Sequence, residues 1–374
     1  MISRSIQHYI EGRLSAKKAA IILGPRQAGK STMIKSIIEN QHLKVQQYNG
    51  DEPQVRAAFE DVGVERLKTL VGNADLLVID EAQRIENIGL ALKIIIDQIG
   101  TVKIIASGSS AFELANTINE PLTGRKWEYF LYPFSFGELV KNTDIITEKS
   151  ALEKRLVFGS YPEVVTSPGM EQEVLVSLTD SYLYKDILAW EKILKPQKLE
   201  KLIKALAFQI GNEVSYTELG QICELDKNTI EKYIALLEKA FIVFRLSSFS
   251  RNLRNELKRS RKIYFYDVGI RNAVINQFSP IPLRQDIGQL WENYWIAERR
   301  KFMDYSQQKT NAYFWRTHAG QEIDYIEEAN GKLTAFECKW SEKTNMKIPG
   351  SFMEAYPNTE LHKVSRTNFE QFLL

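Results

Sequence analysis

Four apolar runs of strand length alternate with helical stretches in the first third of the chain. Between them lie an apolar-faced helical segment at 32–38 and two further regions of helical character, 51–73 and 89–99. The apolar residues of 89–99 lie on more than one face, so we expect that helix to be well buried. A short amphipathic helix at 4–14 precedes the first run. Strands that alternate with helices predict a doubly wound, mostly parallel α/β sheet. The four predicted strands are 19–23, 43–48, 76–79 and 102–106.

The segment between the first strand and its helix fits the pattern G-x-x-x-x-G-K-[ST]. In such a loop the backbone N–H groups cradle nucleotide phosphates, the lysine reaches the outer phosphates, and the hydroxyl meets Mg²⁺. The strand–turn–helix context is the one that this motif requires. We therefore expect an ATP/ADP-binding loop, formed by Gly24, Pro25, Arg26, Gln27, Ala28, Gly29, Lys30, Ser31 and Thr32.

Two further strands end in polar residues that suit a nucleotide site. Asp80 and Glu81 follow the apolar run 76–79, at the strand end where open α/β sheets bind ligands. We expect Asp80 to hold Mg²⁺ and Glu81 to polarise the attacking water; the alternative is an acidic surface turn. Ser107 ends the next strand and is expected to contact that water or a phosphate. In the other interpretation, Ser109 only caps the following helix.

The run from Pro121 to Leu139 completes a family resemblance. Together with Gly-Pro-Arg-Gln-x-Gly-Lys, Val-Ile-Asp-Glu-Ala-Gln and Ser-Gly-Ser-Ser, it resembles prokaryotic AAA+-like ATPases. Members of that family carry a C-terminal domain of unknown function that is similar to PD-(D/E)XK nucleases. The resemblance implies that Arg125 senses or completes a nucleotide site, within one chain or across a subunit interface. The alternative for Arg125 is an ordinary surface residue.

The middle of the chain is mostly helical. The region 146–198 is interpreted as a helical lid, interrupted at Gly159-Ser160-Tyr161-Pro162. The region 199–266 has winged-helix character, with a capping box at Ser215 and a second helix capped at Asn228. Between its two strands, residues 251–262 hold six basic residues and one acid, which is a local nucleic-acid signal. The predicted DNA or RNA contacts are Arg251, Arg254, Lys258, Arg259 and Arg261. Alternatively, this domain packs on the nucleotide domain.

The last hundred residues contain acids spaced as in a nuclease. Asp324 lies on one predicted strand, and Glu337 and Lys339 lie on one face of the next, after a turn at Asn330-Gly331. Glu292 lies in a helix that starts near Gly288. Matched to the PD-(D/E)XK pattern, Asp324, Glu337 and Glu292 would be metal ligands, and Lys339 would orient water or stabilise the transition state. As an isolated pattern, such cross-strand pairs are ordinary surface features.

Composition adds limits. The 374 residues hold 49 basic and 47 acidic residues, so no global nucleic-acid signature exists. Two cysteines exclude a disulfide framework, and no two of the four histidines have metal-ligand spacing. The sequence contains neither a signal-peptide core nor a membrane-spanning run, so we expect a cytoplasmic protein with no membrane contact.

These observations predict four parts: an ATPase domain at 1–145, the lid at 146–198, the winged helix at 199–266 and a nuclease-like α/β domain at 267–374. The first hypothesis is a Mg²⁺-dependent ATPase whose nucleotide state controls a nuclease-like domain acting on DNA or RNA. A homo-oligomer is compatible with it. The rivals are a nucleotide-switched binding protein with an inactive nuclease fold, and a slow ATPase switch with protein clients.

Overall fold

The computed structural model describes residues 2–108, 121–180, 196–250, 260–317, 319–346 and 348–374. The chain forms two compact units. The first comprises Met1–Phe134 with Lys239–Phe241, and the second comprises Ser135–Glu238 with Ile242–Leu374. Each unit contains one sheet, and each is described separately below.

The first unit contains a five-stranded sheet in the order β2-β3-β4-β1-β5, with all neighbouring strands parallel. The strands are β1 (Ala19–Leu23), β2 (Val45–Asn49), β3 (Leu76–Asp80), β4 (Lys103–Gly108) and β5 (Lys126–Phe130). Strands β1, β3 and β4 are apolar and buried because helices cover both faces of the sheet.

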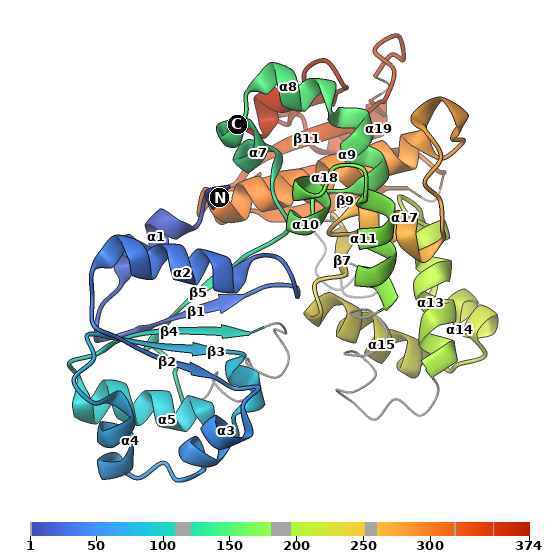
Figure 1. Ribbon diagram of the computed structural model, residues 1–374. Helices are drawn as coiled ribbons and strands as arrows, with labels where there is room; N and C mark the ends of the chain where they lie inside the picture. The colour runs from blue at the N-terminus through green and yellow to red at the C-terminus, as the bar shows by residue number, and fades with distance from the viewer. Residues whose placement is uncertain (1, 109–120, 181–195, 251–259, 318, 347) are drawn as a thin grey trace. The chain divides into compact units, whose positions relative to one another are not determined.

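Helices of the first unit lie on both faces of this sheet (Figure 1). One face carries α1 (Gln7–Arg13) and α2 (Lys30–Gln41). The opposite face carries α3 (Pro53–Glu60), α4 (Val64–Val71) and α5 (Ile88–Ile94), which continues as a π-helical turn over Ile95–Ile99. The doubly wound parallel sheet predicted from the sequence is therefore confirmed, as the fold of P-loop NTPases.

The second unit begins with a group of helices, followed by three that precede its main strands. The first group is α7 (Phe136–Asn142), α8 (Ile145–Ser150), α9 (Leu152–Phe158), α10 (Pro162–Thr166) and α11 (Glu171–Leu178). Helices α13 (Pro196–Phe208), α14 (Tyr216–Cys223) and α15 (Lys227–Lys239) follow. Ser215 caps α14 as predicted, whereas Asp226 rather than Asn228 caps α15, because its carboxylate accepts from the N–H groups of Asn228 and Thr229.

The second unit's sheet has seven strands in the order β12-β11-β10-β9-β7-β8-β6. Its strands are β6 (Glu213–Val214), β7 (Val243–Ser248), β8 (Arg261–Phe265), β9 (Asn311–Arg316), β10 (Glu322–Ala329), β11 (Lys332–Cys338) and β12 (Glu360–Val364). Strands β7 and β9 pair in parallel through Ser247 with Tyr313 and Ser248 with Phe314. The strands of the predicted winged helix and those of the predicted nuclease-like domain thus share one sheet. The domain boundaries stay a prediction.

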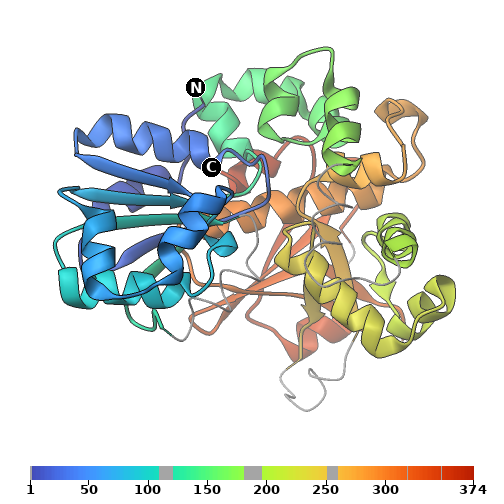
Figure 2. The same cartoon turned by 60° about the horizontal axis from the view of Figure 1, so that its bottom comes forward.

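Helix α18 (Ile287–Tyr305) lies along this sheet in both views (Figure 2). Its fully buried Trp295 contacts Tyr325 of β10 and Phe336 of β11, with ring centroids 5.8 and 5.0 Å apart. The β10–β11 turn uses Asn330 and Gly331, both with positive φ (51° and 77°), as the Asn-Gly pair predicts. This hairpin and α18 position the acidic residues of the second unit. The described part of the second unit also contains α17 (Val268–Val274) and α19 (Gly350–Ala355).

Candidate functional site

The phosphate loop of the first unit connects β1 to α2. Gly29 has φ 92° immediately before α2, a left-handed conformation that glycine adopts at little cost. A Cβ on Gly24 would lie 2.1 Å from the carbonyl oxygen of Leu131, so only glycine fits there. The two glycines of the motif therefore meet backbone requirements at both ends of the loop.

Lys30 is the first residue of α2, and its ammonium group lies beneath the loop. Its Nζ donates to the carbonyl oxygens of Gly24 and Pro25, each at 2.8 Å. Burial lowers the pKa of Lys30 to about 8, and the charges of Glu81 and Asp80 act in the opposite direction. A phosphate group at this loop would favour the charged form, as the predicted role requires.

Asp80 brings three of the predicted residues together at the carboxyl ends of β1, β3 and β4. One of its carboxylate oxygens accepts a hydrogen bond from Ser31 Oγ at 2.6 Å. The other accepts from the buried Ser107 hydroxyl and from the backbone N–H of Glu81. Ser107 thus contacts the acid itself. The oxygen ligands of Ser31 and Asp80 fit the hard-cation chemistry of Mg²⁺.

Glu81 stands in a left-handed conformation with φ 48°, which costs a non-glycine residue energy and is found at functional sites. Its carboxylate accepts from Gln83 Nε2 at 2.5 Å. A Cβ on Gly50 would lie 2.2 Å from the Glu81 carbonyl oxygen, and Gly50 N donates to Asp80 O at 2.8 Å. The turn after β2 thus holds the backbone that presents Glu81. Gly50 escaped the sequence prediction, since its role depends on β2 lying beside β3. Gln83 escaped it as well, although it contacts Glu81 only two residues away.

Arg4 is a third residue whose role the sequence did not reveal. Its buried guanidinium donates to the carbonyl oxygen of Ala28 in the phosphate loop at 2.6 Å. It also donates to Tyr132 O at 2.5 Å and lies 4.8 Å from the centroid of the Phe134 ring. Arg4 therefore ties the phosphate loop to the segment that leaves β5. Nothing in the pattern around residue 4 indicates these partners, which lie far along the chain.

Arg125 does not join this group within the chain. It precedes β5, and its carbonyl accepts from the N–H of Ala19, the first residue of β1. Because the phosphate loop follows the other end of β1, Arg125 lies at the opposite edge of the parallel sheet. Its Nε pairs with Asp97 at 2.6 Å. A role on its own chain's nucleotide does not fit this position, and a role across a subunit interface stays a prediction.

The second unit brings the predicted C-terminal residues into one cluster. Lys339 Nζ lies 2.6 Å from Glu337 Oε1 and 3.8 Å from Asp324 Oδ2. Asp324 also accepts from the N–H of Cys338 at 2.8 Å. Burial raises the pKa of both carboxyl groups, and the charge of Asp324 raises that of Glu337 further.

Glu292 enters the cluster through Lys262, a residue of β8 to which the sequence analysis assigned no contact in this cluster. Lys262 is 1% exposed, and its ammonium lies 3.1 Å from Glu292 Oε1 and against Glu322. The hydroxyl of Tyr264 donates to the same Glu292 oxygen at 2.6 Å. Burial raises the pKa of Glu292, and the charge of Lys262 lowers it in part; the resulting pKa is about 7.

These contacts limit the metal chemistry of the cluster. The carboxylates of Asp324 and Glu337 are of the type that Mg²⁺ prefers, but Glu292 is engaged by an ammonium and a phenol. Within the described ranges, no group of three or more His, Cys, Asp or Glu side chains could hold a metal ion. The metal role predicted for Glu292 therefore does not fit its surroundings, because Lys262 already supplies its positive charge.

The predicted nucleic-acid residues are mostly outside the described ranges. Arg251, Arg254, Lys258 and Arg259 lie there. Arg261 opens β8, where its Nη1 lies 3.3 Å from Glu231 Oε1 and its guanidinium lies 5.2 Å from the centroid of the Tyr216 ring. The guanidinium of Arg261 therefore already contacts Glu231 of α15 and Tyr216 of α14.

The fold and the phosphate loop define the first unit as a P-loop NTPase domain. Residues 16–140 match the family model described as AAA domain, so this unit is an AAA+-like P-loop domain, a class that binds ATP. Residues 149–280 and 287–371 match two domains of unknown function, DUF8612 and DUF4143 respectively. The resemblance to AAA+-like ATPases with a C-terminal domain of unknown function is thereby confirmed.

Two relatives with similar sequences carry the description uncharacterized protein. One from Mycobacterium tuberculosis is 23% identical over 87% of this chain and 72% of its own length. Another, from Haemophilus influenzae, is 24% identical over a region that covers 74% of this chain and 74% of its own length. Among solved structures, AMPPCP-bound DnaA from Aquifex aeolicus covers 62% of this chain and 84% of its own, with 13% identity and a TM-score of 0.30. The match to Thermotoga maritima RuvB, a Holliday junction branch migration motor, covers 67% of this chain and 91% of RuvB, with 15% identity and a TM-score of 0.31.

No helix in the described parts of the chain has the length and apolar character needed to cross a membrane.

Proposed function

We propose that this chain hydrolyses ATP with Mg²⁺ at the phosphate loop, and that its nucleotide state controls the C-terminal nuclease-like region, which acts on DNA or RNA. The observation that carries the proposal is the contact of Ser31 with Asp80 beside the buried Lys30. It unites the hydroxyl, the acid and the ammonium that phosphoryl transfer uses.

In this proposal each residue has a separate task. The loop N–H groups and Lys30 hold the phosphates, and Ser31 and Asp80 hold the ion. Mg²⁺, when bound, would offset the phosphate charge. Glu81 accepts a proton from the attacking water, and Gln83 orients its carboxylate. Ser107 acts through Asp80, whose second oxygen it fixes.

A second candidate is a nucleotide-switched regulator whose C-terminal cluster binds nucleic acid without cutting it. The contact between Lys262 and Glu292 favours it, because an ammonium already neutralises that carboxylate. Under the first candidate, Lys339 contacts the substrate phosphate and orients water from its position between Glu337 and Asp324.

One experiment tests both candidates. Wild type, Lys30→Ala and Lys339→Ala are incubated with Mg²⁺-ATP and single- and double-stranded DNA and RNA, and phosphate release and strand cleavage are followed. The matched controls are Lys35→Ala on α2 and Lys332→Ala on β11, both exposed positions. We expect Lys30→Ala alone to abolish phosphate release; equal release by this variant would refute the ATPase.

The same samples separate the two candidates. Cleavage that Lys339→Ala loses and Lys332→Ala retains supports the nuclease. Nucleic-acid binding that changes between ATP and ADP, with no cleavage in any metal, supports the regulator. If neither nucleic-acid binding nor cleavage differs between ATP and ADP, the proposed control by the nucleotide state is refuted.

A further inference from the structure

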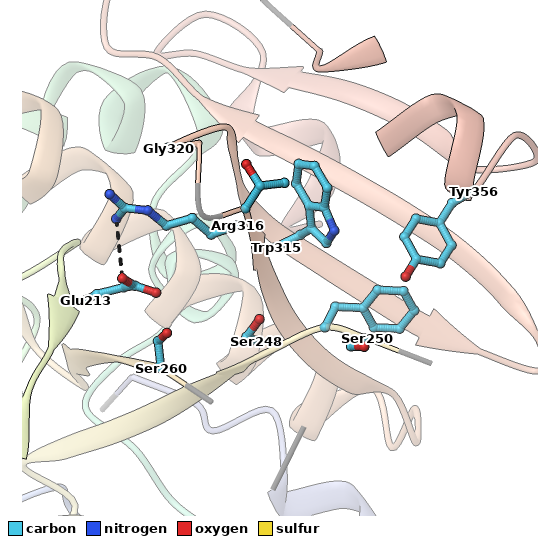
Figure 3. Close-up of a pocket in the computed structure, with 10 residues that line it drawn as sticks. Glu213, Ser248, Ser250, Ser260, Trp315, Arg316, Gly320 and Tyr356 are labelled. Atoms are coloured by element: carbon cyan, nitrogen blue, oxygen red, sulfur yellow. Dashed lines mark ion pairs between the residues drawn. The ribbon is translucent and has the colours of Figure 1, made fainter. Parts of the chain in front are cut away.

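A cavity of about 630 Å³ opens in the second unit, at the ends of β7 and β9 and the start of β8 (Figure 3). Its volume lies within the range of small-molecule sites, about 300–1,000 Å³. Phe249, Trp315 and Tyr356 contribute aromatic rings to its lining. The hydroxyls of Ser248, Ser250, Ser260 and Thr317 contribute polar groups.

The aromatic part of the lining is rigid. Tyr356 packs against Phe249 with ring centroids 5.1 Å apart, and Trp315 packs edge-on against Phe352 at 5.1 Å. Phe249, Trp315 and Phe352 belong to one buried core cluster, so their rings are fixed before any ligand arrives. Fixed aromatic faces favour a flat aromatic ligand, because stacking then costs little side-chain entropy.

The other end of the cavity is polar but has no excess positive charge. In Figure 3, Arg316 extends away from the rings toward Glu213, whose carboxylate lies 3.9 Å from its Nη1. The same guanidinium lies 3.3 Å from Glu322. The carboxylates of Glu213 and Glu322 offset the charge of Arg316, so this end gives a phosphate no net attraction, and carboxylate oxygens accept hydrogen bonds from amino groups. This end therefore suits an uncharged group with N–H donors.

A chain of ion pairs connects the cavity to the acid and lysine cluster. Arg316 pairs with Glu322, Glu322 pairs with Lys262, and Lys262 pairs with Glu292. Lys262 is buried and already paired with two carboxylates. The partly exposed ammonium of the cluster is therefore that of Lys339, which lies beside Asp324, a residue of the same strand as Glu322. A ligand whose flat, uncharged part lies in the cavity thus has this ammonium on the Glu322 side for an attached anion. A nucleotide has this division between an uncharged base and an anionic phosphate.

We propose that this cavity binds one unpaired nucleobase of a single-stranded nucleic acid. The base lies against the aromatic end, its amino edge faces Glu213 and the hydroxyls, and its phosphates lie toward Lys339. The proposal rests on the nucleic-acid part of the proposed function. A paired base cannot enter, because both of its faces are stacked in the duplex and its polar edge is occupied.

The test measures fluorescence anisotropy of labelled 12-mers with the full-length protein at one fixed salt concentration. The probes are single-stranded DNA, single-stranded RNA, the matching DNA duplex and an abasic DNA 12-mer with the same phosphates. Stacking of one base contributes about 1–3 kcal/mol, which corresponds to about 5- to 150-fold in Kd. We expect wild type to bind the single strands at least about fivefold tighter than the abasic strand and the duplex.

Two pairs of variants locate the base in the cavity. Tyr356→Ala should weaken single-strand binding at least about fivefold, whereas Tyr356→Phe retains the ring and the affinity. Because Tyr356 also packs on the core, Ser260→Trp provides a second route. Ser260 is exposed at the cavity, so tryptophan there fills the space without removing core contacts, and Ser260→Ala is its control.

The proposal is overturned if the abasic strand or the duplex binds wild type as tightly as the single strand does. It is also overturned if no single strand binds, or if Ser260→Trp and Tyr356→Ala both bind like wild type. The ATPase proposal fails separately: equal phosphate release by Lys30→Ala refutes it and leaves these binding results unchanged. Which of DNA and RNA binds more tightly identifies the sugar.

Discussion

Glu292 makes the stability of the second unit sensitive to pH. In the folded protein burial raises its pKa from 4.5 to about 7. The folded state therefore binds a proton more tightly than the unfolded chain does. The contribution of Glu292 to the unfolding free energy is fully present below about pH 4.5 and is lost as the pH rises through 7. Since one pKa unit corresponds to about 1.4 kcal/mol, this group alone should remove about 3 kcal/mol.

Glu292→Gln keeps the shape of the side chain and removes its titration. We expect the variant to lose most of the wild-type decrease in stability between about pH 4.5 and 7. Hydrogen exchange of α18 amides measures this locally, because a two-unit chain does not unfold in one step. The ratio of variant to wild-type exchange at each pH cancels the intrinsic pH dependence. Asp324 and Glu337 titrate in both proteins.

The matched control is Glu354→Gln, which removes one carboxylate at an exposed position of α19. It should leave the pH dependence of α18 exchange as in wild type. If Glu292→Gln has the same pH dependence as wild type, or if Glu354→Gln flattens it equally, burial of Glu292 does not control the titration.

Three further predictions concern single contacts. Arg4→Met should weaken ATP binding about tenfold or more by isothermal titration, because the phosphate loop loses a charge-assisted hydrogen bond; Arg4→Lys should recover part, and unchanged affinity in Arg4→Met would contradict this. Gly50→Ala should slow phosphate release about tenfold or more, because its Cβ would lie 2.2 Å from the backbone oxygen of Glu81. The control Gly12→Ala has open space around its Cβ and should keep the wild-type rate. Equal rates in the two variants would show that the backbone at Gly50 does not control Glu81. Lys262→Met should destabilise the second unit by about 3–5 kcal/mol in denaturant unfolding, and adding Glu292→Gln should restore part of that; a double variant as unstable as the sum of the two would show no coupling.

The first unit was predictable because its signals are local. Apolar runs, a glycine-containing loop and strand-terminal acids occupy short windows, and a parallel sheet places the ends of such strands at one edge. That rule places Asp80 and Ser107 at the edge that carries the phosphate loop, and the strand order β3-β4-β1 brings them into contact with one another and with Ser31. Arg125 shows where the family resemblance failed within one chain. It precedes β5 and therefore lies at the edge of the sheet opposite the phosphate loop.

In the second unit the local sequence pattern predicted the β10–β11 hairpin and helix α18, but not which charged side chains pair with one another. Asp324, Glu337 and Lys339 lie near one another because strands alternate and pair in register. Lys262 comes from a strand more than sixty residues earlier in the chain. Its contact with Glu292 exists only because β8 and α18 pack together, and no spacing rule connects them.

The sequence by itself determined the nucleotide-binding fold, the loop and its acids, since each depends on neighbours within a few residues and on the rule that parallel strands end at one edge of a sheet. Tertiary structure alone decided which distant groups neutralise or hold them: Arg4 at the loop carbonyl, Gly50 behind Glu81, and Lys262 against Glu292. The physical reason is that burial makes an unpaired charge costly. Its partner is therefore set by packing in three dimensions, which one-dimensional periodicity does not record.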